Sequence, residues 1–328
     1  MKTIQYKGKT LETIHWKPMS DELHGQLKEE FYKKPEFALV QKEMINLKNG
    51  KVKYTNIEKY YFRELMSKVV LYHSKWSIED VFNHKELLES FYAKTFKNEK
   101  VYPKDKSLIS NIETSFRLGG KGVASKPSNF PIKHVDEILS LYNVNDNYYD
   151  PSCGWGVRLM SALRNNVNYF GTDPNYLLVE QLENLASDYK KVNGDNGKIV
   201  DIRATGSEVF HEDWVGKMGV CFTSPPYFNL EDYKIGGQSW EEGVTYESWL
   251  NNFLEPTIEN AKKYLVSGGY LAININNFAN FDLVGDVRNI VLSKGFAYVT
   301  THTLKNIQRV KSSGGVNDNS EGIMVFQK

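Results

Sequence analysis

The residues with the most distinctive chemistry in this chain are Ser224, Pro225, Pro226 and Tyr227, which directly follow the apolar run 220–223. Two adjacent prolines fix the backbone and supply no N–H, so the carbonyl groups of this turn can accept hydrogen bonds from an external donor. The serine adds a side-chain acceptor and the tyrosine a flat ring. This set suits an exocyclic amino group on a flat base, because the ring can stack while oxygen atoms accept both amino hydrogens and direct the nitrogen lone pair at an electrophilic methyl group. The alternative interpretation is a proline-stiffened loop beside a core tyrosine.

A second candidate site is the segment from Asp150 to Gly156, Asp-Pro-Ser-Cys-Gly-Trp-Gly, where a predicted strand ends and a helix begins. Glycines there let the backbone approach a ligand at the helix N-terminus, although a short glycine-bearing loop can also be only a tight turn. The next predicted strand ends at Asp173, and an acidic residue in that place of an open α/β sheet holds a ribose by its hydroxyl groups. Neither Gly-x-Gly-x-x-Gly nor a complete phosphate-binding loop is present, so we expect an adenosine ligand without a phosphate chain.

The elements that would position these residues alternate between strand and helix. This alternation predicts an α/β fold with a mainly parallel sheet covered on both faces. The last two strands are joined by a loop without room for a crossover helix, so we expect an antiparallel pair at one edge. The predicted strands are 147–149, 169–171, 198–204, 220–223, 270–275, 297–304 and 323–327, and the predicted helices are 131–142, 157–164, 177–191 and 246–265.

The front of the chain has a different pattern. From residue 20 to about 97, apolar side chains recur at helical spacings of three and four. Ser77-Ile-Glu-Asp80 resembles a capping box with Asp in its last position and predicts the start of a helix. The stretch 103–131 is rich in Gly, Ser, Pro and Lys and is typical of a junction. We therefore expect a helical N-terminal region, 1–125, and a second domain, 126–328.

Charge is unevenly divided between these parts. The net charge is +1, but the chain carries +8 up to Lys126 and −7 after it. A basic front part favours contact with a polyanion, and its interleaved Tyr and Phe residues could stack on bases. The alternative is a solvated helical face rich in Lys.

Composition excludes several classes of protein. With 328 residues, 41% hydrophobic and 25% charged, the chain is not disordered, collagenous or stabilised by a disulfide framework, since it has only two cysteines. Its apolar runs fall well short of the roughly 20 residues that span a bilayer. The N-terminus shows no basic-then-apolar signal pattern. We expect a cytoplasmic protein without a membrane partner.

From about residue 126 onward, the chain resembles a class I S-adenosylmethionine-dependent amino methyltransferase of DNA. The family's Asp-Pro-x-x-Gly-x-Gly motif matches Asp150 to Gly156, its acidic second motif matches Asp173, and its Asp/Asn/Ser-Pro-Pro-Tyr/Phe motif matches Ser224 to Tyr227. A Phe that packs on the methionine part of the cofactor matches Phe130. The resemblance implies a Rossmann-like, mainly parallel seven-stranded sheet.

The resemblance also implies a role for each matched position. The target base would be rotated out of double-stranded DNA and its amino group held by Ser224, the Pro225 carbonyl, Pro226 and Tyr227. S-adenosylmethionine would leave as S-adenosylhomocysteine, and transfer would proceed in line, without a metal or a covalent intermediate. The implied cofactor-binding residues are Phe130, Asp150, Ser152, Gly154, Gly156, Asp173, Ser207 and Glu208.

The second domain leaves no long segment for a separate target-recognition domain. About 70 residues separate the cofactor and catalytic motifs, and little chain follows. By elimination, we expect the basic N-terminal region to contact DNA, together with the segment Gly236-Gly-Gln-Ser239 and the loop 305–322. The candidate DNA-binding residues are Lys121, Lys126, Arg309 and Lys311.

Several alternatives remain open at this point. Serine at the head of the catalytic motif slightly favours cytosine N4 over adenine N6. Cytosine C5 chemistry needs a nucleophilic Cys after a proline, whereas Cys221 falls inside a predicted strand. The same fold also serves RNA base methyltransferases and catalytically silent nucleic-acid-binding subunits. The seven His residues show no metal-ligand spacing, no nuclease cluster is evident, and the oligomeric state and a restriction or modification partner stay open.

Overall fold

The computed structural model describes residues 2–14, 18–95, 108–277, 279–303 and 322–328. Contacts within the chain divide it into two units. Each unit contains a hydrophobic core and is described separately. Unit 1 consists of Met1–Pro35, Arg63–Ser128 and Glu231–Lys234, and unit 2 of Glu36–Phe62, Asn129–Leu230 and Ile235–Lys328.

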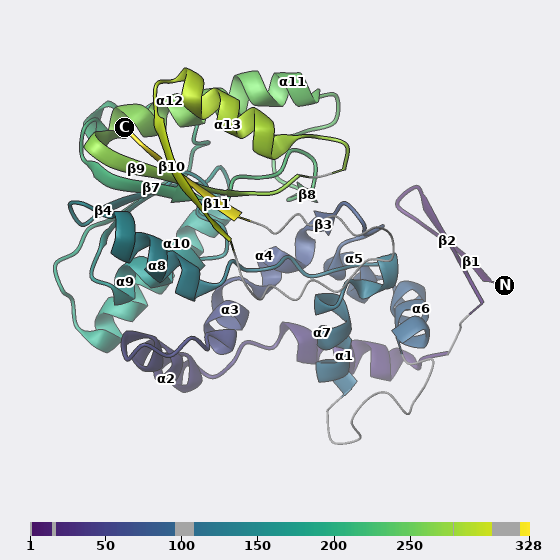
Figure 1. Ribbon diagram of the computed structural model, residues 1–328. Coiled ribbons are helices and arrows are strands. Elements are labelled where there is room, and N and C mark those ends of the chain that lie inside the picture. The colour runs from purple at the N-terminus through teal and green to yellow at the C-terminus, as the bar shows by residue number, and fades with distance from the viewer. Residues whose placement is uncertain (1, 15–17, 96–107, 278, 304–321) are drawn as a thin grey trace. The chain divides into compact units, whose positions relative to one another are not determined.

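Unit 2 is built on a seven-stranded sheet. Its strands are β4 (Asn147–Asp150), β5 (Asn168–Thr172), β6 (Val200–Arg203), β7 (Met218–Thr223), β9 (Leu265–Ile275), β10 (Ala297–Thr303) and β11 (Gly322–Gln327). They lie in the order β10-β11-β9-β7-β4-β5-β6 (Figure 1). The five strands from β9 to β6 in this order are parallel, and β11 is antiparallel to both β9 and β10. The predicted fold class and the antiparallel pair at one edge are confirmed.

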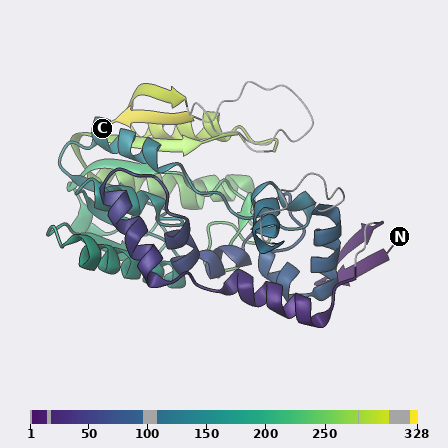
Figure 2. The same cartoon turned by 90° about the horizontal axis from the view of Figure 1, so that it is seen from below.

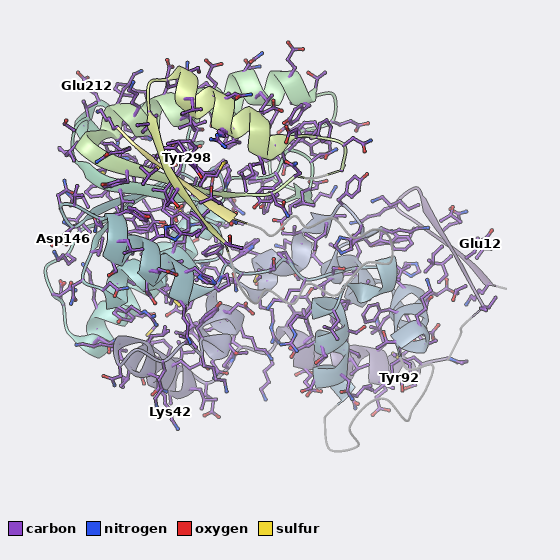
Figure 3. All side chains as sticks on the ribbon, viewed as in Figure 1. Glu12, Lys42, Tyr92, Asp146, Glu212 and Tyr298 are labelled. Carbon is purple, nitrogen blue, oxygen red and sulfur yellow. The ribbon has the colours of Figure 1, made fainter. Side chains whose placement is uncertain are left out.

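Helices cover both faces of this sheet, as Figure 1 shows. One face carries α8 (Ile132–Tyr142), α9 (Val157–Arg164) and α10 (Tyr176–Asn193), and the other carries α11 (Tyr246–Trp249), α12 (Glu255–Tyr264) and α13 (Leu283–Ser293). Central strands between two helical layers are buried on both sides, which explains why all six residues of β7 are buried. At the outer edge, β10 is largely exposed, and Tyr298, labelled in Figure 3, lies on it.

Two features of the second helical layer differ from the sequence prediction. The single helix expected over 246–265 is interrupted by a π-helical segment, Leu250–Leu254. Pro256 follows at the start of α12, and because it has no N–H to donate to the preceding turn, the regular helix restarts there. The other difference is α13, which the sequence analysis missed. Its buried residues Leu283, Val287 and Val291 recur every fourth position, and Asp282 caps it by accepting a hydrogen bond from the Gly285 N–H at 3.3 Å.

Two helices from the expected N-terminal region belong to unit 2. They are α2 (Phe37–Lys48) and α3 (Thr55–Tyr61), and α2 contacts α9 and α10. The Tyr61 hydroxyl donates to Asp188 Oδ2 on α10 at 2.8 Å. The expected division at 125/126 therefore differs from the structure over residues 36–62 and again at Glu231–Lys234. The physical reason is that an amphipathic pattern shows that one face of a helix packs against another element, but it does not identify that element.

Unit 1 combines helices with two small two-stranded sheets. Its core includes the rings of Phe31, Phe82, Phe91 and Phe116, and Phe91 stacks on Phe116 with centroids 4.3 Å apart. The predicted capping box is present, with Ser77 and Asp80 each accepting from the other's backbone N–H. The elements are the hairpin β1 (Lys2–Tyr6) and β2 (Lys9–Thr13), drawn as two arrows near the N-terminus in Figure 2, then α1 (Asp21–Tyr32), α4 (Arg63–Lys68), β3 (Val70–Leu71), α5 (Ile78–Asn83), α6 (Lys85–Thr95), α7 (Leu108–Arg117), a 3-10 turn (Gly120–Gly122) and β8 (Glu231–Asp232), which pairs with β3.

Among the described helices, none combines the length and the apolar character that crossing a membrane requires.

Candidate active site at the carboxyl edge of the sheet

The predicted site residues follow neighbouring parallel strands. The segment 150–156 follows β4, Asp173 follows β5, Ser207 and Glu208 follow β6, and 224–227 follows β7. Because these strands are parallel, the segments leave the sheet at the same edge, which is where open α/β sheets bind ligands. The structure thus brings the predicted cofactor and catalytic segments to one side of unit 2.

The loop after β4 depends on its two glycines. Gly154 and Gly156 have φ values of +57° and +76°, a region that favours glycine. A Cβ atom on Gly156 would also stand 2.8 Å from the Phe62 ring. The loop therefore reaches the start of α9 along a path that other residues fit poorly.

Asp150 is held inside the protein. Its side chain is 0% exposed, and its Oδ2 accepts from Arg158 Nε at 2.8 Å and from the Tyr169 hydroxyl at 2.7 Å. The Arg158 guanidinium also donates to the Ser152 carbonyl, so it links the two ends of the loop. Burial lowers the pKa of Arg158, but the Asp150 carboxylate outweighs this effect and the net shift is upward. The Asp150 carboxylate thus supports the loop from within, together with two residues that the sequence analysis missed.

Asp173 is half-buried at the end of β5. Burial raises the pKa of Asp173 to about 6, against the opposing effect of hydrogen bonds from the backbone N–H groups of Asn175 and Gly154. The loop after β4 is also joined to the end of β5, because the Cys153 N–H donates to the Thr172 carbonyl at 3.2 Å. A half-buried carboxylate beside the glycine loop has the acceptor chemistry that ribose hydroxyls require.

The loop after β6 is fixed by α12. Ser207 Oγ lies 2.7 Å from Thr257 Oγ1, and Asn260 Nδ2 donates to the carbonyls of Ser207 and Glu208, both at 3.0 Å. The Ser207 side chain is buried and bonded within the protein, whereas Glu208 is half-buried. These contacts hold the loop, and the predicted roles of Ser207 and Glu208 toward a cofactor stay predictions.

The catalytic motif is tied to the neighbouring strand β9. Asn274 Nδ2 donates to Ser224 Oγ and to the Tyr227 hydroxyl, each at 3.2 Å. The Tyr227 hydroxyl in turn donates to the Asn274 carbonyl at 3.3 Å. Asn274 was not singled out in the sequence, although a polar residue inside the apolar strand 270–275 is a usable signal.

Burial across the motif is uneven. Ser224 and Pro226 are half-buried, whereas Pro225 is buried and Tyr227 is 9% exposed. The next residue, Phe228, has a φ of +53°, which is uncommon for a bulky side chain. Its ring is held by aromatic neighbours, with centroids 5.3 to 6.3 Å away, from Trp240, Tyr246, Trp249 and Phe281. The turn after the motif is therefore anchored in the core between the sheet and α11–α13.

Phe130 lies next to the strand that carries the motif. Its half-buried ring packs edge-on against Phe222 of β7, with centroids 5.5 Å apart. The preceding side chain is fixed as well, because Asn129 Nδ2 donates to Glu58 Oε2 at 2.5 Å. Phe130 is thus placed by β7 and α3, and its contact with a cofactor stays a prediction.

The candidate DNA-binding residues are less fully described. Lys126 belongs to unit 1 and is half-buried, and its N–H donates to the Phe116 carbonyl at 3.1 Å. Arg309 and Lys311 lie outside the described residues, as does the side chain of Lys121. Their contact with nucleic acid stays a prediction.

Neither cysteine is placed to act as a nucleophile. Cys153 and Cys221 are fully buried, and burial raises the pKa of both thiols. Cys221 lies inside β7, as expected for a small core residue. Within the described part of the chain, no group of three or more His, Cys, Asp or Glu residues could hold a metal ion.

Comparison with known proteins gives a family match over the last third of the chain. Residues 218–328, which begin with β7 and include the catalytic motif and Asn274, match the family described as DNA methylase. No curated protein sequence matches the chain.

Similar solved structures are more distant. They include a TehB-like SAM-dependent methyltransferase from Corynebacterium glutamicum (13% identity, 67% of this chain and 97% of that chain covered, TM-score 0.42). The N-methyltransferase NodS from Bradyrhizobium japonicum is 14% identical (60% and 92% covered, TM-score 0.38). A 1,6-didemethyltoxoflavin-N1-methyltransferase from Burkholderia thailandensis with bound S-adenosylhomocysteine is 9% identical (60% and 77% covered, TM-score 0.41).

Proposed function

We propose that this chain is an S-adenosylmethionine-dependent DNA methyltransferase. It would transfer a methyl group to the exocyclic amino group of a base rotated out of double-stranded DNA, with cytosine N4 slightly favoured over adenine N6. The observation that carries the proposal is the position of Ser224–Tyr227 at the end of β7, beside the loops that follow β4 and β5. The family match over 218–328 supports the same reaction.

The residues at this edge fit the proposed cofactor. Asp173 offers a half-buried carboxylate for ribose hydroxyls, and the half-buried Gly154 presents backbone without a side chain in the turn before α9. The half-buried ring of Phe130 packs against Phe222 of β7, the strand that leads into the motif. When bound, S-adenosylmethionine supplies an electrophilic methyl group on a sulfonium centre.

Methyl transfer at this site would depend on positioning. The Ser224 hydroxyl and the Pro225 carbonyl would accept the two amino hydrogens of the base, which turns the nitrogen lone pair out of the ring system. The nitrogen would then attack the methyl carbon as the S–C bond breaks, leaving S-adenosylhomocysteine, and the surplus proton on the nitrogen would pass to water. Tyr227 is 9% exposed, so a base would stack only on the exposed part of its ring.

The test is methylation of DNA by the purified full chain. Unmethylated double-stranded DNA is incubated with methyl-labelled S-adenosylmethionine, digested to nucleosides and analysed by mass spectrometry. We expect labelled N4-methylcytosine or N6-methyladenine from the wild type and a loss of at least 100-fold in Ser224→Ala and Tyr227→Ala. Ser293→Ala, on an exposed site of α13, is the matched control and keeps wild-type activity.

Other outcomes would replace the proposal. Label in RNA but not in DNA would assign an RNA base amino methyltransferase. Absence of S-adenosylmethionine binding in calorimetry would assign a catalytically silent nucleic-acid-binding subunit.

A further inference from the structure

Asn274 is a buried amide near the end of β9, between two buried isoleucines. Its side chain is 1% exposed, and its neighbours along β9, Ile273 and Ile275, are both 2% exposed. Burying an amide is costly unless hydrogen bonds compensate it. Asn274 Nδ2 donates to two side chains of the motif, Ser224 and Tyr227, which is a reason beyond core packing for a polar residue at this position.

The strand register explains how this residue reaches the motif. β7 and β9 pair in parallel, with Thr223 opposite Ile273. The next position on each chain is therefore Ser224 on one side and Asn274 on the other. This pairing brings the amide to the first residue of the motif, and the turn at Pro225 and Pro226 returns Tyr227 to the same amide.

The hydrogen bonds determine which group donates and which accepts in each contact of this network. Tyr227 donates its hydroxyl hydrogen to the Asn274 backbone carbonyl, so its oxygen must be an acceptor toward the Asn274 side chain. The group facing it is thus Nδ2, and the second hydrogen of Nδ2 points to Ser224 Oγ. The reverse amide orientation would set Oδ1 against a hydroxyl whose hydrogen is already donated.

We propose that Asn274 is a positioning residue that holds the Ser224 hydroxyl and the Tyr227 ring in one fixed arrangement. Because Ser224 Oγ accepts from Asn274, the serine hydrogen points away from β9. One oxygen lone pair then faces the side where a target amino group would lie. The inference rests on the proposed function, since it assigns how this same site is prepared for its substrate.

Substitution by leucine separates positioning from stability. Asn274→Leu keeps a similar volume and suits the apolar strand, so we expect a melting temperature no lower than that of the wild type. We expect kcat to fall by about 10- to 100-fold, because small misplacements of reacting groups are costly, while the dissociation constant for S-adenosylmethionine stays within about twofold. Asn252→Leu, an exposed asparagine bonded only locally to Ser248, is the matched control and should keep wild-type kcat.

A double-mutant cycle tests whether Asn274 acts through Tyr227. We expect Tyr227→Phe alone to lower kcat, and Tyr227→Phe combined with Asn274→Leu to lose no more than the larger single loss. Additive losses would contradict a shared network. Wild-type kcat in Asn274→Leu would overturn the proposal.

A spectroscopic readout keeps this inference distinct from the proposed reaction. In protein labelled with carbon-13 at tyrosine Cζ, the Tyr227 resonance is identified by its absence in Tyr227→Phe. We expect Asn274→Leu to displace that resonance and Asn252→Leu to leave it unchanged. If the wild type methylates neither DNA nor RNA, the proposed function fails. A displaced resonance then still supports the network, and an unchanged one overturns it.

Discussion

Arg158 donates from Nε to Asp150 Oδ2 at 2.8 Å, and the two side chains are 7% and 0% exposed. The pair joins the end of β4 to the second residue of α9, across the glycine loop. A surface ion pair contributes little to stability, but a buried pair that loses one partner leaves a charge without compensation. This relationship therefore gives the first prediction.

We expect Arg158→Met to destabilise the protein by about 3–5 kcal/mol, because the Asp150 carboxylate stays buried without its cation. Asp150→Asn combined with Arg158→Met should recover a large part of that loss, since no buried charge remains. Unfolding in urea, followed by circular dichroism, measures both. Lys85→Met removes an ion pair to the 93% exposed Asp21 and should leave stability nearly unchanged, because solvent screens this pair. Equal losses in Arg158→Met and Lys85→Met would contradict the role of burial.

A second prediction concerns Gly156. Alanine there meets a positive φ and the Phe62 ring, 2.8 Å from its Cβ. We expect Gly156→Ala to cost about 1–3 kcal/mol, the range for overpacking in a core. Gly154→Ala is the matched control, because its Cβ meets nothing closer than Arg158 at 3.6 Å and only the φ penalty of about 1 kcal/mol applies. Phe62→Leu should restore part of the loss in Gly156→Ala, and no recovery would contradict a steric cause.

The raised pKa of Asp173 predicts a pH dependence of stability. Its folded pKa of about 6 exceeds the ordinary value of 3.8, so the folded state binds more protons between these two values. Stability should therefore fall as pH rises from about 4 to about 6 through this group. Asp173→Asn removes this contribution, and its stability relative to the wild type should increase over that interval. Urea unfolding at pH 4.5, 5.5 and 7 measures the difference, and parallel profiles would contradict the shift.

The same group predicts how cofactor affinity depends on pH. If the ionised carboxylate accepts hydrogen bonds from ribose hydroxyls, the affinity for S-adenosylmethionine should fall as pH drops below about 6. Calorimetric titration from pH 5 to pH 8 measures it. We expect Asp173→Asn to bind more weakly at pH 8 and to lose the pH dependence. A wild-type affinity that is flat across pH 5 to 8 would exclude ribose binding by this carboxylate.

The sequence predicted which segments form the site because the residues with distinctive chemistry lie at or directly after the ends of predicted strands. β4 ends at Asp150, and β5 and β7 end one residue before Asp173 and Ser224. The motifs had already marked these three residues, so the order of the elements fixed one edge of the sheet. The partners of these residues were harder to predict. Asn274 and Ser224 are 50 residues apart and meet only through the register of β7 and β9, which no local pattern encodes.

The missed elements have a similar cause. The helix α13 has only 11 residues, and its pattern was missed although Leu283, Val287 and Val291 recur at helical spacing. The amphipathic pattern of α2 was visible, but its partner α10 lies more than 100 residues later in the chain. Local periodicity thus identified the helix faces that must pack against another element. Which element packs there depends on tertiary contacts.

The strands β3 and β8 pair with each other although they lie far apart in the sequence. This pairing affects where the protein can be cut for experiments. Only three residues separate Tyr227 from Glu231, where the chain leaves unit 2 to form β8 against β3. A protein cut between residues 125 and 126 would lose β3, so β8 would have no partner strand a few residues after the catalytic motif. It would also lose α2 and α3, which cover α10 and α9. The two units are interleaved along the chain, so exchanging unit 1 between related proteins requires grafting three separate segments together.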